Sequence, residues 1–205
     1  LKISLYSIVV GFPLPIILAI ISNQLRVGKF RKIFQVTTYL PHFISTMVMC
    51  GMIILFLSPT SGLLANVFKS VGITIPDFLS KPTSFAGVYV WSDVWQHIGW
   101  DSIIYLAALS TIDPTYYEAA TMDGASRLQK IRHIELPLLL PTAMILLILR
   151  AGSLLSVGFE KVLLLQNPLN LAGSEIISTY VYKVGMVNFQ YSYSTAIGLF
   201  NTVVN

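Results

Sequence analysis

Long apolar runs set the strongest limit on how this chain can fold. A helix needs roughly 20 mostly apolar residues to cross a bilayer. Four runs reach that length and a fifth is cut short; they cover residues 3–25, 36–57, 84–112, 138–159 and 192–205. Only 11% of the residues are charged and 55% are hydrophobic, whereas soluble domains carry about a quarter charged residues. The sequence therefore predicts an all-α, polytopic membrane helical bundle with about five spans in this stretch.

The chain is interpreted as one transmembrane domain over residues 1–205, taken from a longer protein and truncated at both ends. It starts in an apolar run at Leu1, without the basic region of a signal peptide. Pro13 and Pro15 are expected to kink the first run. Cys50 is the single cysteine, so a disulfide framework is excluded, and it is expected to be a small buried hydrophobe.

The basic residues between the runs predict which side each connection faces. Lys and Arg accumulate on the cytoplasmic side of a membrane protein. The first and third connections are short and rich in Lys and Arg, carrying Arg26, Lys29, Arg31, Lys32, Arg127, Lys130 and Arg132. The longer second and fourth connections hold only Lys69, Lys81, Lys161 and Lys183. The first and third connections are therefore predicted to be cytoplasmic. The basic residues form no long stripe, so no nucleic acid is expected as a partner.

The third connection, residues 113–137, predicts a helix–turn–helix bracket. Asp113 is a good N-cap, and Pro114 suits the first helical position because it has no amide hydrogen to donate. Gly124 permits a backbone turn that other residues resist. A second short segment follows over residues 126–135, and Pro137 is expected to restart a helix into the next span.

One face of the first short helix is expected to suit close packing against another protein. Tyr116, Ala119 and Ala120 share that face, with Asp123 one turn further on. The two alanines leave it shallow. A bracket that stands on two membrane helices can pass a push from outside the bilayer to both of them.

The same connection carries a recognisable motif. Glu118-Ala119-Ala120 is followed by Asp123-Gly124-Ala125 and then by Ile134-x-Leu136-Pro137. This order and spacing resemble the EAA loop of permease subunits from binding-protein-dependent ABC importers. The flanking sequences IIYLAAL at 103–109 and ISTYVYKVG at 177–185 are similar to the carbohydrate-uptake branch of that family. The resemblance covers nearly the whole chain.

In that family the loop is a coupling helix that sits in a groove of a cytoplasmic ATPase subunit. The resemblance implies that Glu118 makes a polar contact with the ATPase and that Ala119 and Ala120 pack in its groove. It assigns these residues to ATPase binding: Tyr116, Glu118, Ala119, Ala120, Asp123, Gly124, Ala125, Ile134, Leu136 and Pro137. The alternative is an ordinary connection in which the EAA letters occur by chance.

The resemblance also implies the rest of the assembly. The expected partners are cytoplasmic ATPase subunits, a second permease subunit (identical or different), an extracytoplasmic solute-binding protein and membrane lipid. The whole permease is expected to have about six spans in a prokaryotic cell membrane. This chain is expected to be no enzyme and to bind no cofactor, with ATP and Mg on the partner. Consistent with this, Gly28-Lys29 lacks the other residues of a P-loop, since Phe30 follows it and Asn23 replaces the first glycine.

Polar residues within the runs predict a second site. Asp93, His97 and Asp101 recur every four residues, near one helical stripe. This stripe is interpreted as the wall of a polar solute path or as an aromatic interface, in preference to a metal site or proton relay. Arg150 lies midway along the fourth run and is expected either to face the path or to pair with Asp101. The candidate solute path comprises Trp95, Gln96, Trp100, Asp101 and Arg150.

Two further readings follow from these polar groups. His42 is interpreted as a helix-end residue in preference to a metal ligand, and no metal site is predicted. An ion-coupled secondary transporter is the alternative function, with the intramembrane Asp, His and Arg side chains as coupling groups.

Overall fold

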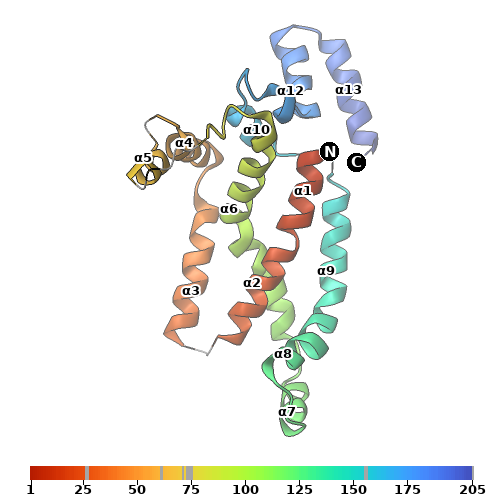
Figure 1. Cartoon of the computed structure of the whole chain (residues 1–205). Coiled ribbons are helices and arrows are strands. Elements are labelled where there is room, and N and C mark those ends of the chain that lie inside the picture. Colours follow the sequence, from red (N-terminus) through yellow and green to blue (C-terminus); the bar gives the residue numbers. More distant parts are fainter. Residues whose placement is uncertain (26–27, 61, 71, 73–75, 155–156, 205) are drawn as a thin grey trace. The chain divides into compact units, whose positions relative to one another are not determined.

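The computed structural model describes residues 1–25, 28–60, 62–70, 72, 76–154 and 157–204, and every regular element in these ranges is a helix (Figure 1). The α-helices are α1 (Lys2–Gly11), α2 (Pro13–Gln24), α3 (Lys29–Tyr39), α4 (Thr46–Leu57), α5 (Leu63–Ser70), α6 (Pro82–Ser110), α7 (Pro114–Met122), α8 (Arg127–Lys130), α9 (Leu136–Ala151), α10 (Phe159–Leu165), α11 (Leu171–Ser174), α12 (Ile177–Tyr182) and α13 (Tyr191–Val204). Three further turns of helix are the 3-10 turn η1 (Leu40–Phe43) and the π turns η2 (Ile131–Glu135) and η3 (Lys183–Val187). Arg26 of the first basic connection lies outside the described residues.

Two helices are long and apolar enough to cross a membrane, Lys2–Gln24 and Arg127–Ala151. A third span is added if Lys29–Phe43 and Thr46–Leu57 count as one. The expectation of about five spans is therefore only partly met in the described ranges. Helix α6 is 29 residues long and matches the third apolar run, and it carries the polar side chains Asp93, His97 and Asp101.

The second apolar run does not form the continuous helix predicted over residues 36–57. Helix α3 gives way to the 3-10 turn η1 at Leu40, where Pro41 has no amide hydrogen for the helical ladder. Helix α4 then starts afresh, because Ser45 has extended backbone angles and its hydroxyl accepts a hydrogen bond from the amide of Val48. The run is thus two helices with a break at residues 44–45.

The fourth apolar run is shifted toward the N-terminus relative to the prediction. The sequence predicts that Pro137 restarts a helix after a separate short segment and that the span ends at residue 159. Instead α8, η2 and α9 run on as one helix over Arg127–Ala151. The π turn ends two residues before Pro137, and the amide of Leu136 bonds to the carbonyl of Ile131. Pro137 thus lies inside a continuous helix, next to a turn whose hydrogen-bond ladder is already irregular.

The described residues form two compact units, which are treated separately. The first comprises Leu1–Ser7, Ile44–Asp93 and Gly152–Asn205, and the second Ile8–Phe43 and Val94–Ala151. In the first unit, α4 packs against α5 and α10, while α12 packs against α10 and α13. Of the two connections predicted to face outside, the fourth is largely helical, whereas the second contains the short helix α5 in its described residues.

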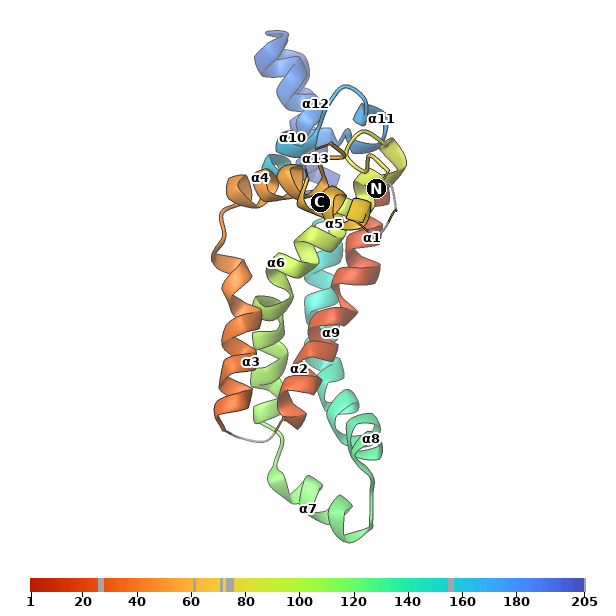
Figure 2. The same cartoon turned by 60° about the vertical axis from the view of Figure 1, so that its left-hand side comes forward.

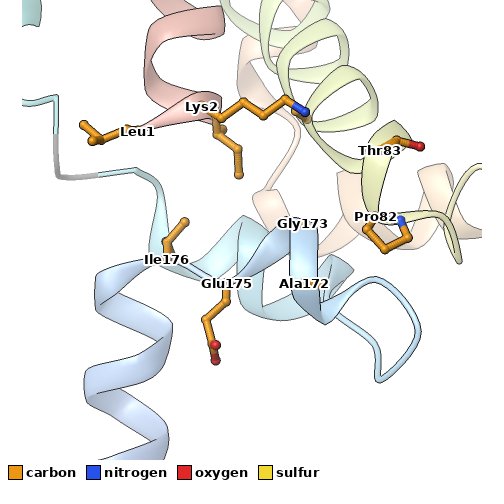
Figure 3. A pocket seen from close by; sticks show the side chains of 10 residues that line it. Leu1, Lys2, Pro82, Thr83, Ala172, Gly173, Glu175 and Ile176 are labelled. Carbon is orange, nitrogen blue, oxygen red and sulfur yellow. The ribbon is translucent and has the colours of Figure 1, made fainter.

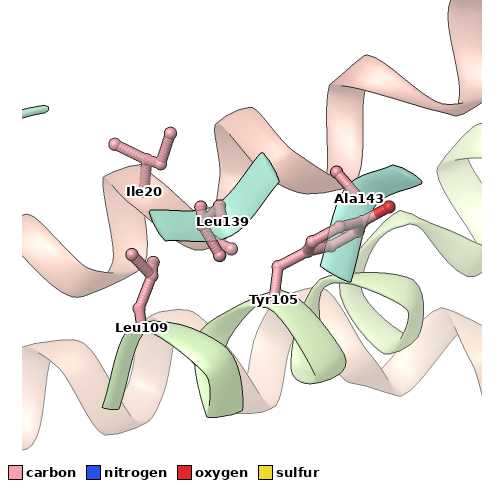
Figure 4. Close-up of a cluster of buried hydrophobic side chains, with 6 residues drawn as sticks. Ile20, Tyr105, Leu109, Leu139 and Ala143 are labelled. Atoms are coloured by element: carbon pink, nitrogen blue, oxygen red, sulfur yellow. The ribbon is translucent and has the colours of Figure 1, made fainter. Parts of the chain in front are cut away.

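The second unit has its core where α2 and α9 lie alongside the C-terminal half of α6 (Figures 1 and 2). Six buried residues form this core, and their side chains converge (Figure 4); they are Ala19, Ile20, Tyr105, Leu109, Leu139 and Ala143. Helix α3 approaches α6 closely at Gly99, where an added Cβ would lie 2.0 Å from the carbonyl oxygen of Thr38. Only glycine fits such a contact.

Candidate functional site

The third connection folds as predicted into a short helix with defined ends. Asp113 has extended backbone angles, and its Oδ1 accepts a hydrogen bond from the amide of Thr115 at 2.9 Å. Pro114 occupies the first helical position. The hydrogen bonds to Thr115 hold the pKa of the Asp113 carboxyl below its ordinary value, so this cap is ionised at neutral pH. The predicted helix start at residues 113–114 is confirmed.

The turn after α7 is a Schellman motif centred on Gly124. The amide of Ala125 donates to the carbonyl oxygen of Ala120 at 2.9 Å, and the amide of Gly124 donates to the carbonyl oxygen of Thr121 at 3.1 Å. Gly124 has a φ of +74°, in the left-handed region. The turn predicted at Gly124 is therefore confirmed, with glycine at the position where a side chain would be strained.

The second arm of the loop is fixed to the first by side chains. Ser126 and Gln129 form a capping box, in which each side chain accepts from the other residue's backbone amide. Lys130 Nζ donates to Thr121 Oγ1 at 2.7 Å, which ties the start of the long helix to α7. The loop is thus one structured bracket.

The two sides of α7 differ in exposure. Glu118 and Ala119 are exposed, together with Tyr116 at 57% and Met122 at 88%. Leu128 on α8 is 74% exposed. Exposed large apolar side chains on a short loop are typical of protein-binding surfaces. We call Tyr116, Met122 and Leu128 the exposed tip of the loop.

The remaining residues assigned to ATPase binding occupy different environments. Ala120 and Ala125 are half-buried, while Asp123 and Gly124 are exposed. The set continues onto the long helix, where Ile134 is half-buried and Leu136 and Pro137 are exposed. The structure therefore brings the EAA and Asp-Gly-Ala segments together and carries Ile134, Leu136 and Pro137 on the helix that leads into the apolar span.

The inner side of α7 contacts a buried carboxylate that the sequence analysis did not single out. Glu135 is 0% exposed. Its Oε1 accepts hydrogen bonds from Asn23 Nδ2 at 3.1 Å, Gln24 Nε2 at 2.8 Å and the hydroxyl of Tyr117 at 3.3 Å. Burial and the neighbouring Glu135 raise the pKa of Tyr117 to about 12, so its phenol remains a donor at physiological pH.

The polar stripe on α6 is divided among three partners. Asp93 accepts from Lys161 Nζ at 3.2 Å, and the Lys161 side chain is only 5% exposed. The ring of His97 makes an edge contact with that of His42 at 5.4 Å. Asp101 forms an ion pair with Arg150. The structure thus contains the Asp101–Arg150 pair that the sequence analysis had proposed.

The other candidate path residues differ in exposure. Gln96 is buried, while Trp95 and Trp100 are 49% and 45% exposed. The ring of Trp100 stacks on that of His42, with centroids 4.3 Å apart and planes at 1°. No group of three His, Cys, Asp or Glu side chains in the described ranges is arranged to hold a metal ion.

The first unit contains a cavity of about 330 Å³ that the sequence did not predict (Figure 3). Lys2 on α1, Pro82 and Thr83 on α6, and Glu175 and Ile176 beyond α11 reach it. Glu175 also pairs with Lys183 at 3.3 Å. None of the predicted path residues lines this cavity.

Comparisons with known proteins agree with this architecture. The family model described as binding-protein-dependent transport system inner membrane component matches residues 11–205. The protein LplB of Bacillus subtilis (strain 168) is 39% identical over 204 residues, which cover 100% of this chain and 64% of LplB. The polygalacturonan/rhamnogalacturonan transport system permease protein YteP of the same organism is 40% identical, over 97% of this chain and 62% of YteP.

A solved structure is similar throughout. In a bacterial ABC transporter involved in the import of the acidic polysaccharide alginate, one chain is 42% identical with a TM-score of 0.95. The match covers 98% of this chain and 71% of that one. This chain spans just under two thirds of the length of LplB and YteP. With a family model that matches nearly its whole length, the chain belongs to the inner membrane components of binding-protein-dependent transport systems.

Proposed function

We propose that this chain is the permease subunit of an ABC importer, and that it forms part of a carbohydrate path driven by ATP hydrolysis on a separate subunit. The observation that carries the proposal is the bracket of residues 113–137, with its Schellman turn at Gly124 and its exposed tip. A rigid, water-facing apolar tip on a membrane protein needs a partner to cover it. A cytoplasmic ATPase subunit is that partner.

The remaining partners follow from the family. The chain acts beside a second permease subunit and receives solute from an extracytoplasmic binding protein. Support for the latter is the alginate transporter, whose structure is also known in complex with an alginate-bound periplasmic protein. ATP and Mg bind to the ATPase, and this chain holds no cofactor. The whole protein is multi-pass and resides in a prokaryotic cell membrane.

Carbohydrate is the proposed class of solute. The matched relatives include a permease for polygalacturonan and rhamnogalacturonan and a transporter of alginate. These polymers carry carboxylates, so an acidic oligosaccharide is the first solute to test. The family match lends no support to the ion-coupled alternative.

The test is uptake by the complete transporter in liposomes. Labelled trigalacturonate and maltotriose serve as an acidic and a neutral trisaccharide probe. We expect uptake of at least one that requires ATP inside and survives an ionophore that collapses ion gradients. Uptake that continues without ATP and stops with the ionophore would instead establish the ion-coupled mechanism.

The proposed orientation gives a separate prediction. In a Cys50→Ala background, single cysteines at Lys29 and Arg132 are expected to react only with membrane-permeant thiol reagents in whole cells. Cysteines at Lys81 and Leu169 are expected to react with impermeant reagents as well. All four side chains are exposed, so failure to react reflects the side of the membrane. An exchange of behaviour between the two pairs would refute the charge-based orientation.

A further inference from the structure

The buried carboxylate of Glu135 joins three separate elements. It stands at the end of η2, directly before α9. Its Oε1 accepts from Tyr117 on α7 and from Asn23 and Gln24, the last two residues of α2. An ionised acceptor makes stronger hydrogen bonds than a neutral one, and burial strengthens them further. The carboxylate therefore holds α7, the proposed coupling helix, and the end of α2 to the same point on the continuous helix Arg127–Ala151.

The connections of the bracket to α9 and α2 differ in kind. Helix α9 continues from α8 and η2 without a break, so movement of the bracket reaches it through the backbone. Helix α2 is far away in sequence from α7, and among the described residues its polar link to the bracket is a cluster centred on Glu135, in which Asn23 also interacts directly with the Tyr117 hydroxyl. Helices α2 and α9 also share the apolar core, to which α2 contributes Ala19 and Ile20 and α9 contributes Leu139 and Ala143.

The π turn makes this position suited to movement. Such turns are rare, and they often occur at functional sites. Glu135 is the last residue of η2, so a shift in this turn would reposition the carboxylate relative to α9.

We propose that Glu135 is the positioning residue that transmits movement of the coupling helix to α2. The inference rests on the proposed function, because it requires an ATPase that moves the bracket. Hydrogen bonds at a buried carboxylate are directional and fix one relative position of the groups they join, whereas the apolar contacts of the core are not directional. Without the carboxylate, α9 follows the ATPase and α2 does not.

The experiment compares nitroxide spin labels on the two helices in the complete transporter. Labels are attached at Ile21→Cys on α2 and at Leu140→Cys on α9, both in Cys50→Ala; these positions are 47% and 58% exposed. Spectra are recorded without nucleotide and with Mg-ATP and vanadate. In the otherwise unchanged protein we expect both labels to respond to nucleotide.

Two variants test the link. Glu135→Gln keeps the shape and one acceptor oxygen but removes the charge, and Tyr117→Phe removes only the hydroxyl donor. In both variants we expect the response at α2 to be lost while the response at α9 persists. Glu160→Gln, the same change at an exposed glutamate on α10, is expected to preserve both responses.

The outcomes separate the two proposals. If both labels still respond in Glu135→Gln and Tyr117→Phe, Glu135 does not transmit the movement. If the spectra of the variants already differ without nucleotide, or the ATPase no longer co-purifies, the role of Glu135 is structural and the inference is again wrong. If neither label responds in the unsubstituted transporter although the ATPase is bound, the proposed coupling function itself fails.

Discussion

Replacing Gly124 with valine will reduce ATP-driven uptake by about ten-fold, while the permease still inserts in the membrane. The loss follows from the backbone, since φ at Gly124 is +74° and no atom lies within 4 Å of an added Cβ. A side chain in the left-handed region costs roughly 1–2 kcal/mol, more for a β-branched one, so the Schellman turn will open. The measurement is initial uptake rate normalised to the amount of permease in the membrane.

Two controls separate backbone strain from side-chain bulk. Gly124→Asn is expected to retain most of the uptake, because asparagine tolerates left-handed angles better than other side chains. Gly51→Ala places a methyl group at a helical glycine that also has open space around it, and it should leave uptake unchanged. Normal uptake in Gly124→Val would show that the bracket of residues 113–137 has no part in coupling.

Replacing either Asp101 or Arg150 with alanine will lower the free energy of unfolding of the permease by about 2 kcal/mol. This value lies between those for exposed and for buried ion pairs. The sequence placed Arg150 midway along an apolar run, but in the structure it is the second-last residue of the apolar helix Arg127–Ala151. Its removal leaves the half-buried Asp101 carboxylate without its partner. The measurement is thermal unfolding of the purified permease for Asp101→Ala and Arg150→Ala. The double variant should regain much of the loss, because neither charge is then left alone.

The Glu175–Lys183 pair is a matched control. Its side chains are 40% and 33% exposed, close to the 30% and 39% of Asp101 and Arg150. It lies outside the two apolar spans, where water screens the charges, so Glu175→Ala should change stability by less than about 1 kcal/mol. If Asp101→Ala changes stability as little as Glu175→Ala does but slows uptake, the pair contributes to the solute path and its structural role is minor.

The sequence was most informative where one residue type dictates a local geometry. Asp113, Pro114 and Gly124 predicted the start and turn of α7, because a cap, a missing amide and a left-handed φ each require particular residues. The Asp101–Arg150 pair followed from the cost of a charge at membrane depth. The all-α membrane fold followed from the apolar runs.

Other features depended on contacts that no local pattern records. The break after η1 and the unbroken helix through Pro137 depend on how the backbone resolves a missing amide, and a proline pattern alone allows either outcome. Glu135 resembles any charged residue of a cytoplasmic loop until Asn23 and Gln24, more than a hundred residues earlier, are placed beside it. Lys161 resembles a loop residue in the sequence because its partner Asp93 lies 68 residues earlier. Whether the candidate path residues contact solute stays a prediction.

Photo-cross-linking from the exposed tip tests the central claim most directly. A benzophenone amino acid replaces Met122, the most exposed residue of the tip at 88%, in the complete transporter, and Leu169, at 69%, serves as the control position. The account predicts a cross-link from position 122 to the ATPase subunit and none from position 169. If the ATPase co-purifies but cross-links only from position 169, or from neither position, the bracket of residues 113–137 is not its docking site.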